Sequence, residues 1–260
     1  MTSISQKFAQ LRAEKKKALI AFITAGYPDL EATTRYLTVL EKAGVDIAEI
    51  GVPFSDPSAD GPTIQYSSQK ALEKGISLPA IFAWIKKIRP QFSLPLVLMS
   101  YYNPIYQLGK KLIPNIIQSE VQGLIIPDLP PDEEENFQKK LEEKNIDLIF
   151  LLAPTSNQQR IKLAAEKSKG FIYVVSLTGV TGARSALSPQ VKSLLQKIRR
   201  YTDKPLALGF GISRPEQVQP LRNSCDGIII GSALIEIIRQ GGDVEKKLAD
   251  FLKPFGEILG

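Results

Sequence analysis

The chain has 260 residues, 43% of them hydrophobic, and its 33 Lys and Arg against 27 Asp and Glu give a formal net charge of +6. It has no histidine and a single cysteine, Cys225, which excludes His-ligated zinc, Ser–His or Cys–His nucleophiles and an internal disulfide. Acid–base chemistry must therefore come from Asp, Glu, Lys or Tyr. The basic residues are scattered among acidic ones, which favours an ordinary solvated surface over a nucleic-acid or membrane partner.

The longest apolar run, residues 18–23, is far too short to span a membrane. It follows three lysines, as in a signal peptide, but a helical pattern precedes it and a Gly-Tyr-Pro turn follows it. A buried first strand explains the run better than secretion does. We expect a cytoplasmic protein, or one of a plastid stroma.

Apolar segments alternate along the chain with stretches of helical periodicity. In chain order, strands are predicted at 18–24, 47–52, 96–100, 123–126, 146–152, 171–176, 206–208 and 227–230. Helices are predicted at 1–17, after a cap at Asp29, at 63–74, 78–88, 105–119 and 131–144, after a cap at Asn157, from Ser188, from Ser213 and from Ser232. Eight strands at about 32 residues per unit predict a single (β/α)8 (TIM) barrel domain over 1–260. The N-terminal helix and one helix of the pair at 63–88 are additions to the repeat.

Three helices carry specific local signals. Pro114 is expected to bend or break the helix at 105–119. Four acidic residues at 132–135 are expected in the first turn of the helix at 131–144, where they complement the helix dipole. Ser213 and Glu216 are expected to form a capping box for the helix that follows.

The segment 49–62 is the most informative part of the chain. Glu49 lies within an apolar strand that is expected to be buried on both faces, and Asp60 lies on the loop that follows. A buried carboxyl has a raised pKa, whereas one on a wet loop stays ionised. Two carboxyls in different environments suit separate acid and anion roles, although an edge strand with a solvated Glu and an acidic turn fits the spacing equally well.

Glycines follow the last three predicted strands. Gly182 lies in the loop after 171–176, Gly211 follows 206–208, and Gly231 with Ser232 follows 227–230. Glycines let the backbone approach an anion, a helix N-terminus offers free N–H groups, and barrels bind phosphate at these loops. The sequence therefore predicts a phosphate site. The long loop at 177–187 is expected to act as a lid that brings Thr181 and Arg184 to this site on closure, with disorder without function as the alternative.

The segment 49–62 resembles the signature of the tryptophan synthase alpha subunit family. The resemblance extends to Phe22 with the run 24–28, to 180–182, to Gly209-Phe210-Gly211 and to Gly231-Ser232, and it covers nearly the whole chain. Two positions depart from the family pattern: Ser58, in the loop, where the family usually has an apolar residue, and Pro127, where a small residue is expected in the pocket wall.

The resemblance implies a lyase that cleaves indole-3-glycerol phosphate to indole and glyceraldehyde 3-phosphate by a retro-aldol step. It implies that Glu49 is the acid–base residue and that Asp60 stabilises or accepts the indole N–H. It implies the following substrate-binding residues: Phe22, Tyr101, Ile125 and Pro127 around the indole, Tyr173 orienting the substrate or Glu49, and Gly182, Gly211, Gly231 and Ser232 at the phosphate. It also implies Thr181 and Phe210 as further substrate-binding residues.

The resemblance further implies that this subunit needs no metal or organic cofactor. Its partner would be a beta subunit that uses pyridoxal phosphate and receives indole through a tunnel, in an alpha2beta2 heterotetramer. The loop after the second strand and the segment 101–106 would face that partner.

Two alternatives remain open at this level. One is another phosphate-binding barrel enzyme, such as a sugar-phosphate isomerase or indole-3-glycerol phosphate synthase, although the synthase would be expected to carry catalytic lysines at its strand ends. The other is a barrel without activity of its own that activates a partner. A turnover assay on the isolated chain separates binding from catalysis.

Overall fold

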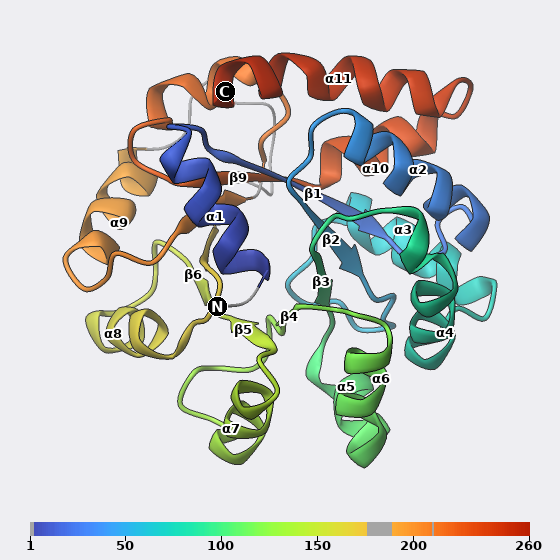
Figure 1. The fold of residues 1–260 in the computed structure, drawn as a ribbon, viewed down its shortest axis with the longest axis horizontal. Helices are drawn as coiled ribbons and strands as arrows, with labels where there is room; N and C mark the ends of the chain where they lie inside the picture. The colour runs from blue at the N-terminus through green and yellow to red at the C-terminus, as the bar shows by residue number, and fades with distance from the viewer. Residues whose placement is uncertain (1–2, 176–188, 210) are drawn as a thin grey trace.

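Parallel strands wrap into a barrel that is surrounded by helices (Figure 1). The computed structural model describes residues 3–175, 189–209 and 211–260. The strands are β1 (Ala18–Thr24), β2 (Ile47–Gly51), β3 (Leu96–Met99), β4 (Gly123–Ile125), β5 (Asp147–Ile149), β6 (Leu151–Leu152), β7 (Ile172–Val175), β8 (Leu206–Gly209) and β9 (Gly227–Ile230). The helices are α1 (Ser3–Ala13), α2 (Leu30–Lys42), α3 (Pro62–Glu73), α4 (Leu78–Ile88), α5 (Tyr102–Leu108), α6 (Leu112–Gln118), α7 (Glu135–Glu143), α8 (Gln158–Lys167), α9 (Pro189–Arg199), α10 (Ser232–Gln240) and α11 (Val244–Leu259). Four short 3-10 helices complete the description: η1 (Arg89–Gln91), η2 (Gly109–Lys111), η3 (Pro215–Gln217) and η4 (Gln219–Leu221).

The predicted (β/α)8 barrel is confirmed. The sheet order is β5-β4-β3-β2-β1-β9-β8-β7-β6, with every pairing parallel. β5 and β6 lie at the two ends of this order, yet Phe150 alone separates them in the chain. They are two parts of the strand predicted at 146–152, which pairs with β4 through its first half and with β7 through its second half. This shared segment closes the barrel and accounts for nine strands in place of eight.

The core has two layers, one inside the barrel and one between the sheet and the helices. Every residue of β1 and of β2 is buried, as expected for strands covered on both faces. The helices contribute one apolar stripe each. On α11, Leu248, Leu252, Phe255 and Leu259 follow helical spacing and are all buried. Each such side chain stabilises the fold by about 1.5–3 kcal/mol relative to an exposed one.

Helix α1 crosses the N-terminal ends of the strands (Figure 1). A methyl group at Gly123 or at Gly170 would lie 3.0 Å from Ile4, and Phe8 packs against Phe171 at 5.7 Å between ring centroids. The helix predicted at 1–17 ends at Ala13, because Lys15 adopts a left-handed conformation with φ of +59° that stops it. The strand ends at this side of the barrel are therefore covered.

Two predicted helix caps are confirmed. Asp29 Oδ1 accepts a hydrogen bond from the amide of Ala32 at 2.7 Å, and Asn157 Oδ1 accepts one from the amide of Arg160 at 2.8 Å. Such caps satisfy amides that have no partner within the helix.

The helix predicted at 105–119 is divided, but not by its proline. α5 ends at Leu108, because the next residue, Gly109, has φ of +50°, and α6 begins at Leu112. Pro114 lies in the first turn of α6, where a missing amide hydrogen removes no helical bond. The prediction of a break was right, and its assignment to Pro114 was wrong. Paired helices also follow β2 and β9, so the chain departs from the simple repeat at more places than expected.

Two predicted helix starts are wrong. α7 begins at Glu135, because the Gln138 side chain donates to the carbonyl oxygens of Pro131 and Glu133 and holds the preceding residues in a turn. One acidic residue in place of four therefore lies in its first turn. After β8, Gln217 Oε1 accepts from the amides of Ser213 and Arg214, both at 2.9 Å. The Gln217 side chain therefore caps the start of the short helix η3, while its amide donates to the backbone oxygen of Arg214 at 3.2 Å, and the predicted capping box of Ser213 and Glu216 is not formed.

An arginine with the same local geometry precedes β3 and β8. Arg89 Nη1 donates to the carbonyl oxygen of Leu94 at 2.7 Å, and Arg199 Nη1 donates to that of Lys204 at 2.6 Å. Each guanidinium also reaches the carbonyl oxygen three residues after it, at 3.5 Å. β3 and β8 are not neighbours in the sheet, so the same pair of arginine hydrogen bonds fixes the chain before two separate strands.

Among the described helices, none combines the length and the apolar character needed to cross a membrane.

Candidate active site

A cavity of about 200 Å³ opens at the C-terminal ends of the strands. Side chains and backbone from both halves of the barrel meet there, as the parallel arrangement requires. Its described lining is Phe22, Glu49, Asp60, Gly61, Pro62, Thr63, Ile64, Met99, Tyr173, Gly211, Ile229, Gly231 and Ser232. The two glycines predicted to hold an anion, Gly211 and Gly231, therefore lie on the same cavity as Glu49.

Glu49 points into this cavity from the middle of β2. It lies opposite Phe22 of β1 and Val97 of β3 in the strand register. Its side chain is 1% exposed, and neither carboxyl oxygen has a hydrogen-bond partner among the described residues. Burial raises the pKa of Glu49 to about 8, and the nearby carboxylate of Asp60 adds to the shift. A carboxyl in this setting holds a proton at neutral pH.

Asp60 reaches the same cavity from the loop after β2 and is held there by Tyr101. The Tyr101 hydroxyl donates to Asp60 Oδ2 at 3.2 Å and accepts from the amide of Ala59 at 2.9 Å. The Phe54 ring stacks on the Tyr101 ring at 5.1 Å between centroids. Burial raises the pKa of Asp60 to about 6, while the hydrogen bond from Tyr101 opposes the rise.

The two carboxyls have different protonation states between about pH 6 and about pH 8. Within this window Asp60 is ionised, and burial together with the negative charge of Asp60 keeps the proton on Glu49. A proton donor and an anion that face one cavity can act on opposite ends of a bound molecule. No group of three or more acidic or sulfur ligands suited to a metal ion occurs in the described part of the chain.

Glycines make room for the two aromatic rings of the cavity. A methyl group at Gly51 would lie 2.4 Å from Phe22 Cζ, and one at Gly209 would lie 2.5 Å from the Tyr173 hydroxyl oxygen. Larger residues at either position would displace a ring. Burial raises the pKa of the Tyr173 hydroxyl well above its usual value, so it stays protonated.

The opposite side of the cavity is polar backbone. Gly211 has φ of +77°, a conformation that favours glycine, and Gly231 with Ser232 begins α10. The first amides of a helix have no partner within the helix and carry positive dipole character. This side therefore suits an anionic group of the ligand.

Six predicted site residues are not part of the described lining. Thr181, Gly182 and Phe210, and the predicted lid at 177–187, lie outside the described residues. Tyr101, Ile125 and Pro127 do not belong to the described lining: Tyr101 turns its hydroxyl to Asp60, and Ile125 is fully buried.

Met99, Ile229 and residues 61–64 also line the cavity but were not among the predicted site residues. The alternation of side chains along a strand identifies Met99 and Ile229. Met99 lies opposite Gly51 on the face that carries Glu49, and Ile229 lies opposite Ile20 on the face that carries Phe22.

Comparison with known proteins gives one consistent result. The sequence profile described as "Tryptophan synthase alpha chain" matches residues 8–257. The chain belongs to the tryptophan synthase alpha chain family. A tryptophan synthase alpha chain of Thermoanaerobacter sp. (strain X514) is 46% identical over 263 residues, with all of both chains covered. That of Picosynechococcus sp. (strain PCC 7002) is 44% identical over 261 residues and covers 100% of this chain and 98% of its own.

Solved structures agree with this family. Tryptophan synthase subunit alpha from Legionella pneumophila superposes with a TM-score of 0.91 at 30% identity, covering 100% of this chain and 98% of its own. A chain of tryptophan synthase from M. tuberculosis superposes with a TM-score of 0.89 at 30% identity, with all of both chains covered. The predicted resemblance to the tryptophan synthase alpha family is thus confirmed.

Proposed function

We propose that this chain cleaves indole-3-glycerol phosphate to indole and glyceraldehyde 3-phosphate, the alpha reaction of tryptophan biosynthesis. Its family supports this activity. The single observation that carries the mechanism is the placement of two carboxyls, Glu49 and Asp60, on one cavity with pKa values raised to different extents.

The reaction breaks the bond between indole C3 and glycerol C3′. Glu49 in its protonated form gives its proton to indole C3, while the carboxylate of Asp60 accepts a hydrogen bond from the indole N–H and stabilises the positive charge that develops there. The C3–C3′ bond then breaks, its electron pair returns to the ring, and the C3′ hydroxyl gives up its proton as the aldehyde forms. The Glu49 carboxylate takes that proton and is restored. Protons and electrons balance without a metal or an organic cofactor.

The remaining lining divides into two parts. Phe22, Met99, Tyr173 and Ile229 supply an apolar wall for the indole ring. Gly211, Gly231 and Ser232 supply backbone amides for the phosphate. On the resemblance, Gly182 is a further phosphate residue and Thr181 and Phe210 are further substrate-binding residues, and we assign Tyr101 to the positioning of Asp60.

The family implies a beta subunit as partner. We propose an alpha2beta2 heterotetramer in which the beta subunit holds pyridoxal phosphate and receives the indole. Tyr106, at the end of the segment 101–106, is 69% exposed, and its ring lies tilted against that of half-buried Tyr102 at 5.9 Å between ring centroids. An exposed aromatic side chain in this segment suits the contact with that partner.

The test is an assay of indole release from indole-3-glycerol phosphate by the isolated chain, with and without a beta subunit. We expect turnover that Asp60→Asn lowers at least about 10²-fold, in line with the loss of a single transition-state contact. Glu143→Gln is the matched control, because Glu143 is exposed on α7. Absence of turnover both alone and with a beta subunit would overturn the proposal, and binding of a beta subunit without turnover would favour a non-catalytic activator.

A further inference from the structure

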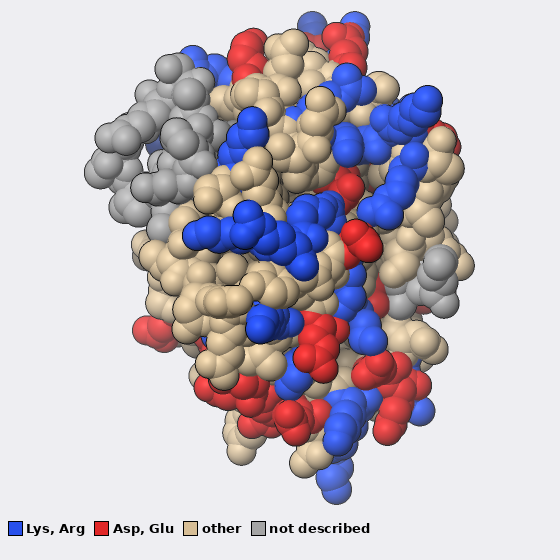
Figure 2. All heavy atoms as spheres, turned by 90° about the vertical axis from the view of Figure 1, so that its left-hand side faces the viewer, with Lys and Arg blue, Asp and Glu red and all other residues tan. Residues whose placement is uncertain are grey.

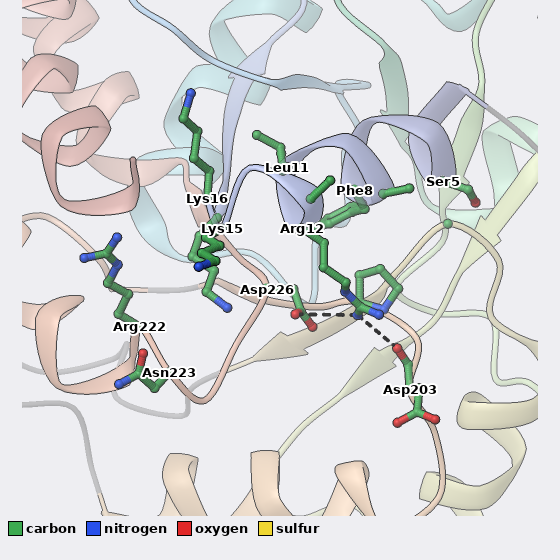
Figure 3. A pocket seen from close by; sticks show the side chains of 15 residues that line it. Ser5, Phe8, Leu11, Arg12, Lys15, Lys16, Asp203, Arg222, Asn223 and Asp226 are labelled. Atoms are coloured by element: carbon green, nitrogen blue, oxygen red, sulfur yellow. Dashed lines mark hydrogen bonds and ion pairs between the residues drawn. The ribbon is translucent and has the colours of Figure 1, made fainter.

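A second hollow lies at the opposite end of the barrel from the catalytic cavity. It has a volume of about 670 Å³ and is bordered by α1, the turn at 14–17, Gly170, the start of β8 and the segment 222–226 (Figure 3). Its position at the N-terminal ends of the strands separates it from Glu49 and from the amides of Gly231 and Ser232. We call it the basal hollow. Its volume falls in the range of small-molecule sites.

The basal hollow is lined by more cations than carboxylates. The charged lining residues are five cations, Arg12, Lys15, Lys16, Lys17 and Arg222, and two carboxylates, Asp203 and Asp226. These cations come from two segments that lie some 200 residues apart in sequence and that α1 brings together at the barrel end. On the face shown in Figure 2, Lys and Arg form a band over the middle and upper part while Asp and Glu gather near the lower end, so the surface charge is uneven.

The two carboxylates do not neutralise this cluster. Asp226 is paired with Arg199, accepts from the amide of Leu206 at 2.9 Å and lies 3.8 Å from Arg12. Its charge is therefore already offset by two guanidinium groups. Asp203 presents its backbone oxygen to Arg12 at 3.3 Å and turns its carboxylate away from the hollow (Figure 3).

Three of the cations remain available. Lys15 and Lys17 have no ion-pair partner in the described part of the chain, and Arg222 donates only to the backbone oxygen of Gly260 at 3.4 Å. Lys16 differs, because it pairs with Glu14 at 3.0 Å and extends away from Arg12 and Arg222 in Figure 3.

The backbone that carries these lysines is fixed. The amide of Lys16 donates to Leu11 at 2.8 Å and that of Lys17 donates to Leu259 at 2.9 Å. Lys15 sits between them at φ of +59°, the left-handed conformation that commonly ends a helix. The charges are therefore held at the edge of the basal hollow by the fold.

We propose that the basal hollow binds a small multivalent oxyanion that carries two or more phosphate groups. Single exposed ion pairs contribute little, so measurable binding at this site needs a ligand that engages several cations at once. Nucleic acid is a poorer fit, because the one aromatic residue of the lining, Phe8, is buried and offers no face for base stacking. The inference concerns a site separate from the catalytic cavity and does not depend on the proposed function.

The test uses inorganic pyrophosphate as the probe. Backbone amide NMR spectra of the intact chain are recorded during titration, with the catalytic cavity filled by an unreactive indole alkyl phosphate. We expect saturable shifts at residues 12–17 and 222–226, and weaker binding when salt is raised from about 50 to about 200 mM. Shifts confined to residues 231–235, or no saturable shift up to about 10 mM pyrophosphate, overturn the proposal.

Variants separate this site from general charge effects. The pair Lys15→Gln with Arg222→Gln is expected to weaken pyrophosphate binding about 5-fold or more, whereas Lys139→Gln with Lys140→Gln on exposed α7 leaves it unchanged. Equal affinity in the two double variants overturns the proposal. Lys15→Gln alone, whose side chain makes no hydrogen bond in the described structure, serves where the double variant fails to fold. Indole release by all these variants should equal that of the wild type, so loss of the basal hollow and loss of lyase activity remain distinguishable.

Discussion

The hydroxyl oxygen of Tyr101 lies 3.2 Å from Oδ2 of Asp60 and also accepts the amide of Ala59 at 2.9 Å. Tyr101 therefore ties the end of β3 to the loop after β2 and fixes the orientation of the loop carboxylate. A hydrogen bond to a charged group stabilises the charged form, which makes Tyr101 a positioning residue for Asp60 rather than a wall of the indole pocket.

Tyr101→Phe tests this role. The variant keeps the ring on Phe54 but removes the donor, so the pKa of Asp60 should rise further and the acidic limb of kcat/KM should move up by about one pH unit, equivalent to about 1.4 kcal/mol. A pH profile of indole release measures the shift. If the limb stays in place while KM alone rises, Tyr101 acts on substrate binding and not through Asp60.

The pH dependence of the wild type follows from the two carboxyls. Activity needs ionised Asp60, with a pKa of about 6, and protonated Glu49, with a pKa of about 8. We expect kcat/KM to rise through about pH 6, to fall through about pH 8, and to reflect the coupled pair. In Asp60→Asn the fall of kcat/KM on the alkaline side should occur at a lower pH, because the negative charge that adds to the raised pKa of Glu49 is gone. An alkaline limb that does not move in Asp60→Asn would contradict the electrostatic coupling.

Glu49→Gln should abolish turnover and change how stability depends on pH. General acid–base groups contribute about 10²–10⁴-fold, and near wild-type turnover in the variant would remove Glu49 from the mechanism. The folded state of the wild type holds a proton on Glu49 more tightly than the unfolded chain does, since the pKa rises from 4.5 to about 8. The unfolding free energy of the wild type should therefore fall between about pH 4.5 and pH 8, by an amount on the order of a few kcal/mol.

Glu49→Gln carries no proton at this position, so its stability should fall less over the same range. Urea unfolding of both proteins at several pH values measures the difference. Parallel curves for wild type and variant would show that the pKa of Glu49 is not raised.

Gly51→Ala tests the close packing of Phe22 on β2. The added methyl group would lie 2.4 Å from the Phe22 ring, so the ring has to move at a cost of about 1–3 kcal/mol of stability, and KM for the substrate should rise. Phe22→Leu in the same chain should restore part of the stability. Gly256→Ala is the control, because a methyl group at Gly256, on α11, meets no atom within 4 Å and Gly256 does not line the catalytic cavity. A loss of stability in Gly51→Ala no larger than in Gly256→Ala would contradict the packing.

Arg89→Met tests the arginine that fixes the entry to β3. The guanidinium bonds two backbone carbonyl oxygens and pairs with Glu120 at 3.3 Å, so its loss should lower the unfolding free energy by about 1.5–3 kcal/mol. Lys87→Met, exposed near the end of α4, is the control and should stay within about 0.5 kcal/mol. Chemical denaturation measures both. A similar loss in the two variants would assign the effect to charge alone.

The sequence by itself determined the barrel and placed Glu49 within one of its strands. The alternation of apolar strands with amphipathic helices fixes the parallel barrel, because each strand must be covered on both faces and each helix buries a single stripe. Local side-chain chemistry likewise determined the caps at Asp29 and Asn157. For Glu49 the sequence left two outcomes open, a buried carboxyl with a raised pKa and a solvated one on an edge strand, and the structure shows the buried one.

The tertiary structure decided what depends on distant contacts. Whether Tyr101 faces the indole or Asp60 is set by where the loop after β2 folds back, and sequence spacing carries no information on that contact. Helix starts such as Glu135 depend on a single side chain, Gln138, reaching back to carbonyl oxygens. The basal hollow exists because α1 crosses the barrel end and brings Lys15 beside Arg222, two residues whose charges looked scattered along the chain. Periodic burial is a local property of the sequence, whereas a cavity and its charge are made by segments that meet only after the barrel closes.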